Sequence, residues 1–416
     1  MGTNRSSMRD GPLADLFRRT EDSEPAGSQE LWADDHPSDP SGNSAYVAVI
    51  RVVGIGGAGC NAINRMIAAG LGGVEFVAIN TDRQSLERSE ADVQIPIGLD
   101  LTTGRGTGGD PATGELAMRA AEEQIRRSLR GSDLVFITTG EGGGTGTGGA
   151  PVVAKIAREL GALTIAVVTR PFGFEGNRRA SVADEGIEML HGLADTVVVI
   201  PNDRLMRVLD KKTSMVDAFQ VCDDLLRQGV QGICDLITLP GLINLDFADV
   251  RTIIKGAGSA LLGIGVASGP DRARLAAQAA TESPLLETPI DGARGILLGI
   301  TGGPDLSLME VTEAARVVSE AADPEANIIF GATIDPGVEG NVWVTVVAAN
   351  FSGVRSGPAP ERKGERKVEA LPERRSSSTV AAAGLEPAPS LDEVPEAPDL
   401  SAMRSDEGIR RGESPY

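Results

Sequence analysis

The chain alternates between short apolar runs rich in Val and Ile and longer segments whose apolar residues recur every three or four positions. The first pattern predicts buried β-strands, and the second predicts amphipathic helices. Strands that are apolar on both faces need helices on both sides, so the alternation predicts a parallel, doubly wound α/β sheet. Strands are expected over Tyr46–Gly54, Val74–Asn80, Leu134–Thr139, Leu163–Thr169 and Thr196–Ile200, and helices from the Gly54–Gly59 turn to about Ala69, over Gly114–Leu129 and from about Ala150 to Leu160.

A long helical pattern separates this region from a second one of the same kind. Ser214–Leu236 keeps a helical periodicity until Pro240-Gly241 ends it, which predicts one connecting helix. Residues 1–45 and 356–416 are polar, rich in charged residues and Pro, and without periodicity, so we predict a disordered leader and a disordered tail. In the second α/β region, about 245–350, strands are expected over Gly295–Thr301, Ala326–Ile334 and Val342–Ala349.

Composition narrows the functions open to such a fold. Hydrophobic residues make up 41% of the 416 residues, enough for a large core, and the formal net charge is −20. A surface this acidic repels nucleic-acid backbones and anionic membranes, so we expect no nucleic-acid partner. A phosphate site in this chain must therefore work through local backbone N–H groups.

The chain has few cysteines and histidines from which a metal site or a catalytic triad could be built. The three cysteines, Cys60, Cys222 and Cys234, form no CxxC pair, and the two histidines are His36 and His191. This indicates a reduced protein without a zinc site or a Ser-His-Asp triad, and we assign no metal-ligating residue. No apolar run reaches the roughly 20 residues of a membrane-spanning helix, and no signal peptide is evident, so we expect a cytoplasmic chain without direct membrane insertion.

Two glycine-rich turns each lie between a predicted strand and a predicted helix. The first, Gly54-Ile55-Gly56-Gly57-Ala58-Gly59, fits a dinucleotide-binding fingerprint with Asp82 downstream. Such glycines also arise from close packing of a helix on a strand. This turn alone therefore leaves open an NAD(P)-dependent Rossmann oxidoreductase.

The second turn, Gly142–Gly148, is more specific, with the sequence GGGTGTG directly after a predicted strand. Glycine lets the backbone approach a ligand, successive N–H groups form an anion-binding nest, and the following helix adds its positive end. Thr145 and Thr147 add hydroxyl donors. Neither turn has the GK[ST] sequence of a P-loop. Two such turns on neighbouring strands indicate one phosphate chain held from two sides, with Gly104–Asp110 as a third contributor.

Several motifs follow one another between residues 46 and 350. They are VVGIGGAGCNAINRM at 52–66, NTD at 80–82, GGGTGTG at 142–148, RPFGFEGNRR at 170–179, IPND at 200–203 and NLDFADV at 244–250. In sequence and order they resemble FtsZ, the family of bacterial tubulin-like cell-division GTPases. The resemblance implies a tubulin/FtsZ-like fold with a disordered leader (1–45), a Rossmann-like GTP-binding domain (46–213), a central helix (214–238), a smaller C-terminal activation domain (239–352) and a disordered tail (353–416).

The resemblance also implies GTP/GDP as the ligand and assigns its contacts. A carboxylate such as Asp223 can accept from guanine N1–H and N2–H, which adenine lacks. Without the resemblance, Glu175 and Arg179 would be an ordinary i,i+4 surface ion pair, and Phe219 would be a core residue. The implied contacts are Gly57, Ala58, Gly59, Cys60 and Asn61 at the phosphates and toward the base, Gly143, Gly144, Thr145, Gly146 and Thr147 along the phosphate chain, Glu175 and Arg179 on the ribose and phosphate side, Asn202 and Asp223 at guanine, and Phe219 beside the base.

Asn244, Asp246 and Asp249 form a second group. From the sequence alone, Asp246 is a helix N-cap and Asp249 a favourable acid in the first turn. The resemblance implies instead a catalytic loop that enters the nucleotide site of the next subunit, where the two carboxylates polarise the attacking water and Asn244 positions it. Mg²⁺ on the phosphates would offset their charge. The chain would then be its own partner in head-to-tail filaments at the division site.

Three features depart from the family pattern. Cys60 stands where a small or polar residue is common, and a thiol beside the phosphates would make binding sensitive to oxidation. Thr107 is bulkier than the usual residue of the third glycine segment, which leaves a catalytically slow, filament-forming paralogue as an alternative. The candidate peptide for a membrane anchor or division protein, Leu391–Arg404, lacks the usual aromatic residue, and a plain disordered tail is its alternative.

Overall fold

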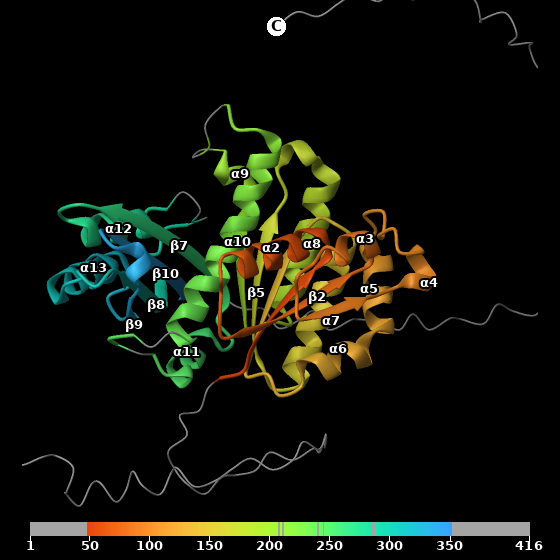
Figure 1. Ribbon diagram of the computed structural model, residues 1–416, viewed down its shortest axis with the longest axis horizontal. Helices are drawn as coiled ribbons and strands as arrows, with labels where there is room; N and C mark the ends of the chain where they lie inside the picture. Colours follow the sequence, from red (N-terminus) through yellow and green to blue (C-terminus); the bar gives the residue numbers. More distant parts are fainter. Residues whose placement is uncertain are drawn as a thin grey trace, which may run out of the picture. The chain divides into compact units, whose positions relative to one another are not determined.

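A ten-stranded sheet runs through the computed structural model of the chain, in the order β3-β2-β1-β4-β5-β6-β7-β10-β8-β9 (Figure 1). The structure describes residues 48–351 except 207–208, 210–211, 239–240, 244, 284–285 and 287. The first six strands all run parallel, which confirms the predicted parallel sheet. They are β1 (Ile50–Ile55), β2 (Val74–Asn80), β3 (Val93–Pro96), β4 (Leu134–Gly140), β5 (Leu163–Arg170) and β6 (Thr196–Pro201).

Strand β7 (Gly258–Ser268) joins the parallel strands to the rest of the sheet. It pairs in parallel with β6 and antiparallel with β10 (Asn341–Phe351). β10 is also antiparallel to β8 (Ala293–Gly302), and β9 (Asn327–Ile334) lies parallel to β8. The predicted strands of this region are thus confirmed, whereas β7 was not predicted.

Strand β7 was not predicted from the sequence because Gly263 and Gly265 interrupt its apolar pattern. A Cβ at either position would collide with the backbone of α12 (Arg272–Thr281), at Ala280 and Ala276 respectively. The two glycines therefore allow the helix to pack closely on the strand.

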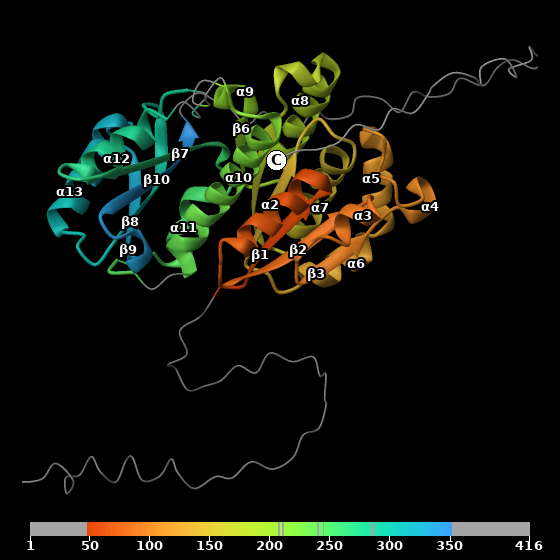
Figure 2. The same cartoon turned by 45° about the horizontal axis from the view of Figure 1, so that its top comes forward.

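Helices cover both faces of the parallel strands. α2 (Gly56–Ala68) and α10 (Met215–Thr238) pack on the face that carries Val52 and Phe136, and four helices pack on the face that carries Val53 and Ile137. α12 and α13 (Leu308–Ala321) cover β8, β9 and β10 at one end of the sheet (Figure 2). The four helices are α5 (Pro111–Ala120), α6 (Glu122–Leu129), α7 (Thr145–Glu159) and α8 (Asn177–His191), and the short elements are α3 (Arg83–Leu86), α4 (Leu99–Thr102), α9 (Asn202–Leu205), α11 (Phe247–Ile254), η2 (Gly173–Glu175) and η3 (Pro336–Val338).

Two helices differ from the prediction in their bounds. The helix expected over 114–129 is two helices, and α5 begins at Pro111 because the Asp110 carboxylate accepts from the N–H groups of Ala112 and Thr113. α7 begins at Thr145 instead of near Ala150. The second half of the glycine turn is therefore already the first turn of a helix.

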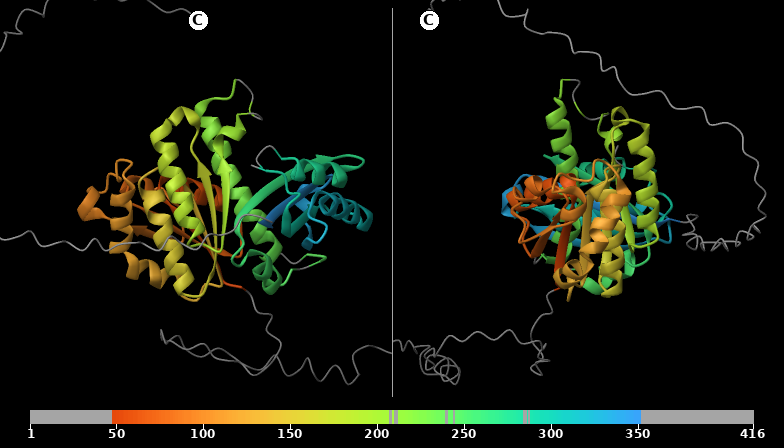
Figure 3. Two further views of the ribbon diagram at one scale, coloured as in Figure 1. Left: turned by 180° about the vertical axis from the view of Figure 1, so that it is seen from behind. Right: turned by 90° about the vertical axis from the view of Figure 1, so that its right-hand side faces the viewer.

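The predicted connecting helix is confirmed as α10. Its 24 residues span about 36 Å at 1.5 Å per residue, and Figure 3 shows it in green between the two groups of strands. A Cβ at Gly229 or Gly232 would press on Leu262 or Thr345, so these glycines make room for the sheet. Within the described ranges, no helix is long and apolar enough to cross a membrane. The predicted leader, the tail and the peptide 391–404 lie outside the described residues.

Candidate functional site

An open cleft with a volume of about 320 Å³ lies at the carboxyl ends of β1, β4, β5 and β6. This end of a parallel sheet is where open α/β proteins bind ligands. Both glycine-rich turns line the cleft, as do Thr107, Gly108 and Gly109 of the third glycine segment. Three segments far apart in sequence thus meet as predicted.

The turn after β4 is built to bring backbone close to a ligand. Gly142 has φ +92°, and a Cβ there would meet the Arg179 carbonyl. A Cβ at Gly144 or Gly146 would collide with the hydroxyl oxygen of Thr107 or Thr139. Side chains are therefore excluded at these three glycines, and the turn leads into the N-terminus of α7, which favours an anion.

The two threonines of this turn have different roles. Thr145 lines the cleft, and its hydroxyl lies 2.6 Å from that of Thr81. Thr147 is buried and is not among the residues that line the cleft; its Oγ1 accepts the N–H of Gly142 at 2.8 Å. Thr147 therefore fixes the turn from within.

Only part of the first glycine turn lines the cleft. Gly56, with φ +70°, lines the cleft together with Gly57 and Ala58. The predicted contacts Gly59, Cys60 and Asn61 are not part of its lining: Gly59 and Cys60 are buried, and Asn61 is exposed.

Cys60 lies in the hydrophobic core and not beside the cleft. Its Sγ is 3.8 Å from the Asn80 Nδ2 donor, and burial raises the pKa of its thiol to about 11. A buried neutral thiol reacts slowly with oxidants. The structure therefore gives no support to the expected oxidation sensitivity.

Glu175 and Arg179 meet at the cleft as an ion pair of 2.6 Å. Glu175 Oε1 also accepts the N–H of Phe172 at 2.9 Å, and Arg179 Nε donates to the Gly142 carbonyl at 3.4 Å. The pair is thus tied to the phosphate turn. Arg179 is the cation best placed to face the phosphate and ribose side of a ligand.

The far side of the cleft offers groups suited to a base. Phe219 lines it with its side chain partly exposed and packs edge-on against Phe172, with ring centroids 5.4 Å apart. Asn202 is buried there, and its Oδ1 has no hydrogen-bond partner among the described residues. A buried acceptor without a donor is costly, so this oxygen fits a ligand that brings an N–H group.

Asp223 completes this side of the cleft. Burial raises the pKa of its carboxyl group to about 6, and Arg65, whose Nε is 3.6 Å from Oδ2, lowers it by less. Together with Asn202 it places hydrogen-bond acceptors on this side of the cleft. The cleft thus combines a glycine cradle, an aromatic face and an unpaired acceptor, which are features that suit a nucleotide.

Sequence analysis missed several residues that line the cleft, among them Thr139, Thr169, Pro171, Glu141 and Cys222. Glu141 could have been noticed, because it is an acid between the strand and the run of glycines. Cys222 precedes Asp223 on α10, and burial raises its thiol pKa to about 12. No group of three His, Cys, Asp or Glu side chains that could hold a metal ion is found in the part of the chain that the structure describes.

The predicted catalytic acids lie apart from the cleft of their own chain. Asp246 precedes α11 and Asp249 lies in its first turn, and both are exposed. The cleft uses the N-terminal part of α10, at Phe219 and Asp223, whereas α11 follows its C-terminal end, as Figure 1 shows. Asn244 lies outside the described residues.

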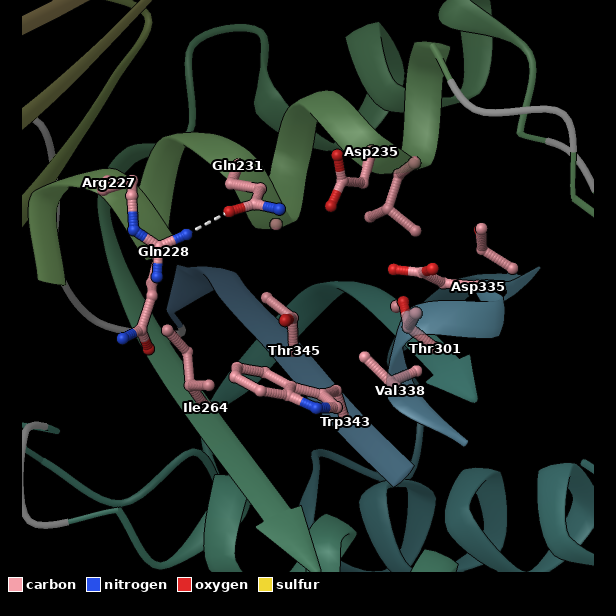
Figure 4. Close-up of a pocket in the computed structure, with 14 residues that line it drawn as sticks. Arg227, Gln228, Gln231, Asp235, Ile264, Thr301, Asp335, Val338, Trp343 and Thr345 are labelled. Atoms are coloured by element: carbon pink, nitrogen blue, oxygen red, sulfur yellow. Dashed lines mark hydrogen bonds between the residues drawn. The ribbon is translucent and has the colours of Figure 1, made fainter. Parts of the chain in front are cut away.

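A second cavity, with a volume of about 140 Å³, lies between α10 and strands β7 to β10 (Figure 4). It is lined by Gln231, Asp235, Trp343 and Thr345 among others. Burial raises the pKa of Asp235 to about 6, Gln231 lowers it and Asp335 adds to the rise. None of the predicted nucleotide contacts lines this cavity.

The fold and the cleft define an α/β protein that holds a nucleotide at the carboxyl ends of parallel strands. The model of the GTPase domain of the Tubulin/FtsZ family matches residues 49–210, and the model of the C-terminal domain of the FtsZ family matches residues 258–352. The chain belongs to the tubulin/FtsZ family and is a GTPase. The oxidoreductase alternative is thereby excluded, since the GTPase model spans both glycine turns.

Solved structures agree with this assignment. An empty FtsZ dimer of M. jannaschii is 48% identical, with a TM-score of 0.71, and the match covers 73% of this chain and 88% of that one. A GTPγS-bound protofilament of CetZ2 from Haloferax volcanii is 23% identical, with a TM-score of 0.63, and the match covers 73% and 94% of the two chains. The second match shows the shared fold.

Proposed function

We propose that the chain forms head-to-tail filaments with GTP and that the loop of one subunit completes hydrolysis in the cleft of the next. The observation that carries this proposal is the position of Asp246 and Asp249, exposed and beyond the opposite end of α10 from the cleft. Among the described residues, the acids that line the cleft are Glu141, which is buried, and Glu175 and Asp223, which pair with Arg179 and Arg65. A cleft that binds phosphates but lacks an exposed, unpaired carboxylate for the attacking water would be half of an active site. A heterologous contact between copies would supply the other half and leave both filament ends open.

The chemistry required is phosphoryl transfer to water. The glycine turns and Arg179 would hold the phosphate chain, and Asp223 and Asn202 would orient guanine. Asp246 and Asp249 of the neighbour, with Asn244, would position and polarise the water. Mg²⁺ bound with the nucleotide would offset phosphate charge. Loss of the γ-phosphate would weaken the contact and let the filament turn over.

The cellular role follows from this assembly. We propose a cytoplasmic filament at the division site, with residues 46–213 as GTP-binding domain, 214–238 as central helix and 239–352 as activation domain. The tail over 353–416 would reach membrane anchors or other division proteins. The 48% identity to FtsZ of M. jannaschii supports the division role.

Light scattering and phosphate release, followed together after GTP and Mg²⁺ are added, test the proposal. In the wild type, light scattering should rise before phosphate release begins. Asp249→Ala should bind GTP normally but hydrolyse it at least about 100-fold more slowly. Fast phosphate release without scattering would contradict hydrolysis in trans. Scattering with slow wild-type release would instead identify the slow, scaffolding paralogue.

A further inference from the structure

Glu141 is a buried acid of the cleft that the proposed reaction does not use. It follows β4 directly and is 3% exposed. Its N–H donates to the Thr169 carbonyl at 2.9 Å, which ties it to the end of β5. Within the described ranges neither of its carboxylate oxygens has a hydrogen-bond partner of good geometry, and the one group that stabilises the carboxylate is the Thr147 hydroxyl. Burial with so little compensation favours the neutral acid over the carboxylate.

Helix α8 provides the space for this carboxyl group. A Cβ at Gly186 would collide with Oε2 of Glu141 and with Cγ2 of Thr147, so both side chains lie against the helix at this glycine. Thr147 in turn accepts the Gly142 N–H through Oγ1 at 2.8 Å. The carboxyl group is therefore packed beneath the phosphate turn, against the residue that holds the turn in shape.

The surrounding charges are already paired with one another. At the end of β5, Arg170 forms an ion pair of 2.8 Å with Asp184 of α8, and Arg179 of α8 pairs with Glu175 of η2. Burial raises the pKa of Glu141 to about 7, and the nearby Thr147 hydroxyl lowers it by less. No charged side chain of the described residues contributes to this shift.

We propose that Glu141 is a positioning residue that carries a proton whenever the phosphate turn holds a nucleotide. The inference rests on the proposed function only in that this turn binds nucleotide phosphates. An ionised Glu141 would place a negative charge beneath the turn that receives a negative phosphate chain, in an interior that screens charge poorly. Binding therefore selects the neutral acid, and the carboxylate takes up one proton from solvent as the nucleotide enters.

This coupling gives the pH dependence a definite sign. If only the neutral form binds, loss of the Glu141 proton by itself lowers the association constant about tenfold between pH 6 and pH 8, apart from changes that come from the nucleotide or from Asp223. Glu141→Gln keeps the shape of the side chain and removes its ionisation, so this part of the pH dependence disappears. Glu185→Gln is the matched control, because Glu185 is exposed on α8 beside Gly186 and has the same charge.

The test is calorimetric binding of GDP to nucleotide-free chain at pH 6, 7 and 8 without divalent metal. The ratio of the association constants at pH 6 and pH 8 should be about tenfold larger for wild type and Glu185→Gln than for Glu141→Gln. Equal ratios in the three proteins would overturn the proposal. Glu141→Met, an apolar replacement of similar length, should behave like Glu141→Gln and replaces it if the amide variant does not fold.

A proton count on the wild type needs no variant. Titrations at pH 8 in two buffers of different ionisation enthalpy should show uptake of about 0.9 proton per GDP, because most Glu141 is ionised there before binding. No uptake at pH 8 would overturn the proposal. A wild-type chain that binds no GDP at any pH would refute the nucleotide site itself, so the two failures are distinguishable.

Discussion

At the scale of single residues, we predict that Asp223 sets a lower pH limit on guanine binding. The pKa of its carboxyl group is about 6, raised by burial and partly lowered again by Arg65. Recognition needs the carboxylate, because only the ionised form accepts both N1–H and N2–H of guanine. The affinity for a guanine nucleotide should therefore weaken as the pH falls through 6. The effect proposed for Glu141 is the reverse, since it weakens binding as the pH rises.

We expect the affinity for GDP to fall about tenfold between pH 7 and pH 5 in the wild type through this residue. Asp223→Asn should bind GDP more weakly at pH 7, and its affinity should no longer fall between pH 7 and pH 5. Competition with a fluorescent GDP measures both affinities. Asp224→Asn is the control, since Asp224 contacts Arg227 and Gln228 and does not line the cleft. If the affinity of Asp223→Asn still fell about tenfold between pH 7 and pH 5, the predicted contact of Asp223 with guanine would be contradicted.

At the scale of elements, the N-terminus of α2 combines an open position with a predicted binding role. Gly57 is exposed on the cleft, and a Cβ there would meet nothing within 4 Å in the ligand-free chain. An added methyl group would leave the fold intact but occupy the space through which the backbone reaches a phosphate. Stability and binding can therefore be separated at this helix.

Gly57→Ala should leave the melting temperature unchanged or slightly higher, because Ala favours a helix by up to about 1 kcal/mol over Gly. Lost backbone contacts of about 1–3 kcal/mol should weaken GTP binding roughly 10- to 100-fold. Gly72→Ala, equally open but outside the cleft, should change neither quantity. A wild-type affinity in Gly57→Ala would mean that phosphates do not approach this turn.

At the scale of the whole molecule, the separation of Asp249 from the cleft allows complementation between two inactive variants. Asp223→Ala impairs the cleft and keeps the loop, whereas Asp249→Ala keeps the cleft. In mixed filaments about a quarter of the contacts would join an intact cleft to an intact loop. An equimolar mixture should therefore recover roughly a quarter of the wild-type GTPase rate, measured by phosphate release. A rate no higher than the mean of the two separate variants would place both groups in one subunit.

Sequence alone determined those features whose cause is local. Apolar runs such as Val74–Asn80 and Leu163–Thr169 had to become buried parallel strands, and their alternation with helices fixed the class of fold. The glycine turns were equally clear, because only glycine allows the close backbone approach that they show. The domain division and the roles of the catalytic acids stay predictions.

Tertiary structure decided which side chains face the ligand. Cys60 lies one residue beyond the cleft turn yet points into the core, because the first turn of α2 rotates it toward the sheet. Strand β7 formed where glycines obscured the pattern, since α12 packs over them. Glu141 became a buried acid only because a glycine of α8, 45 positions later in the chain, leaves space for it. Such long-range packing leaves no local periodicity, so it could be read only from the folded chain.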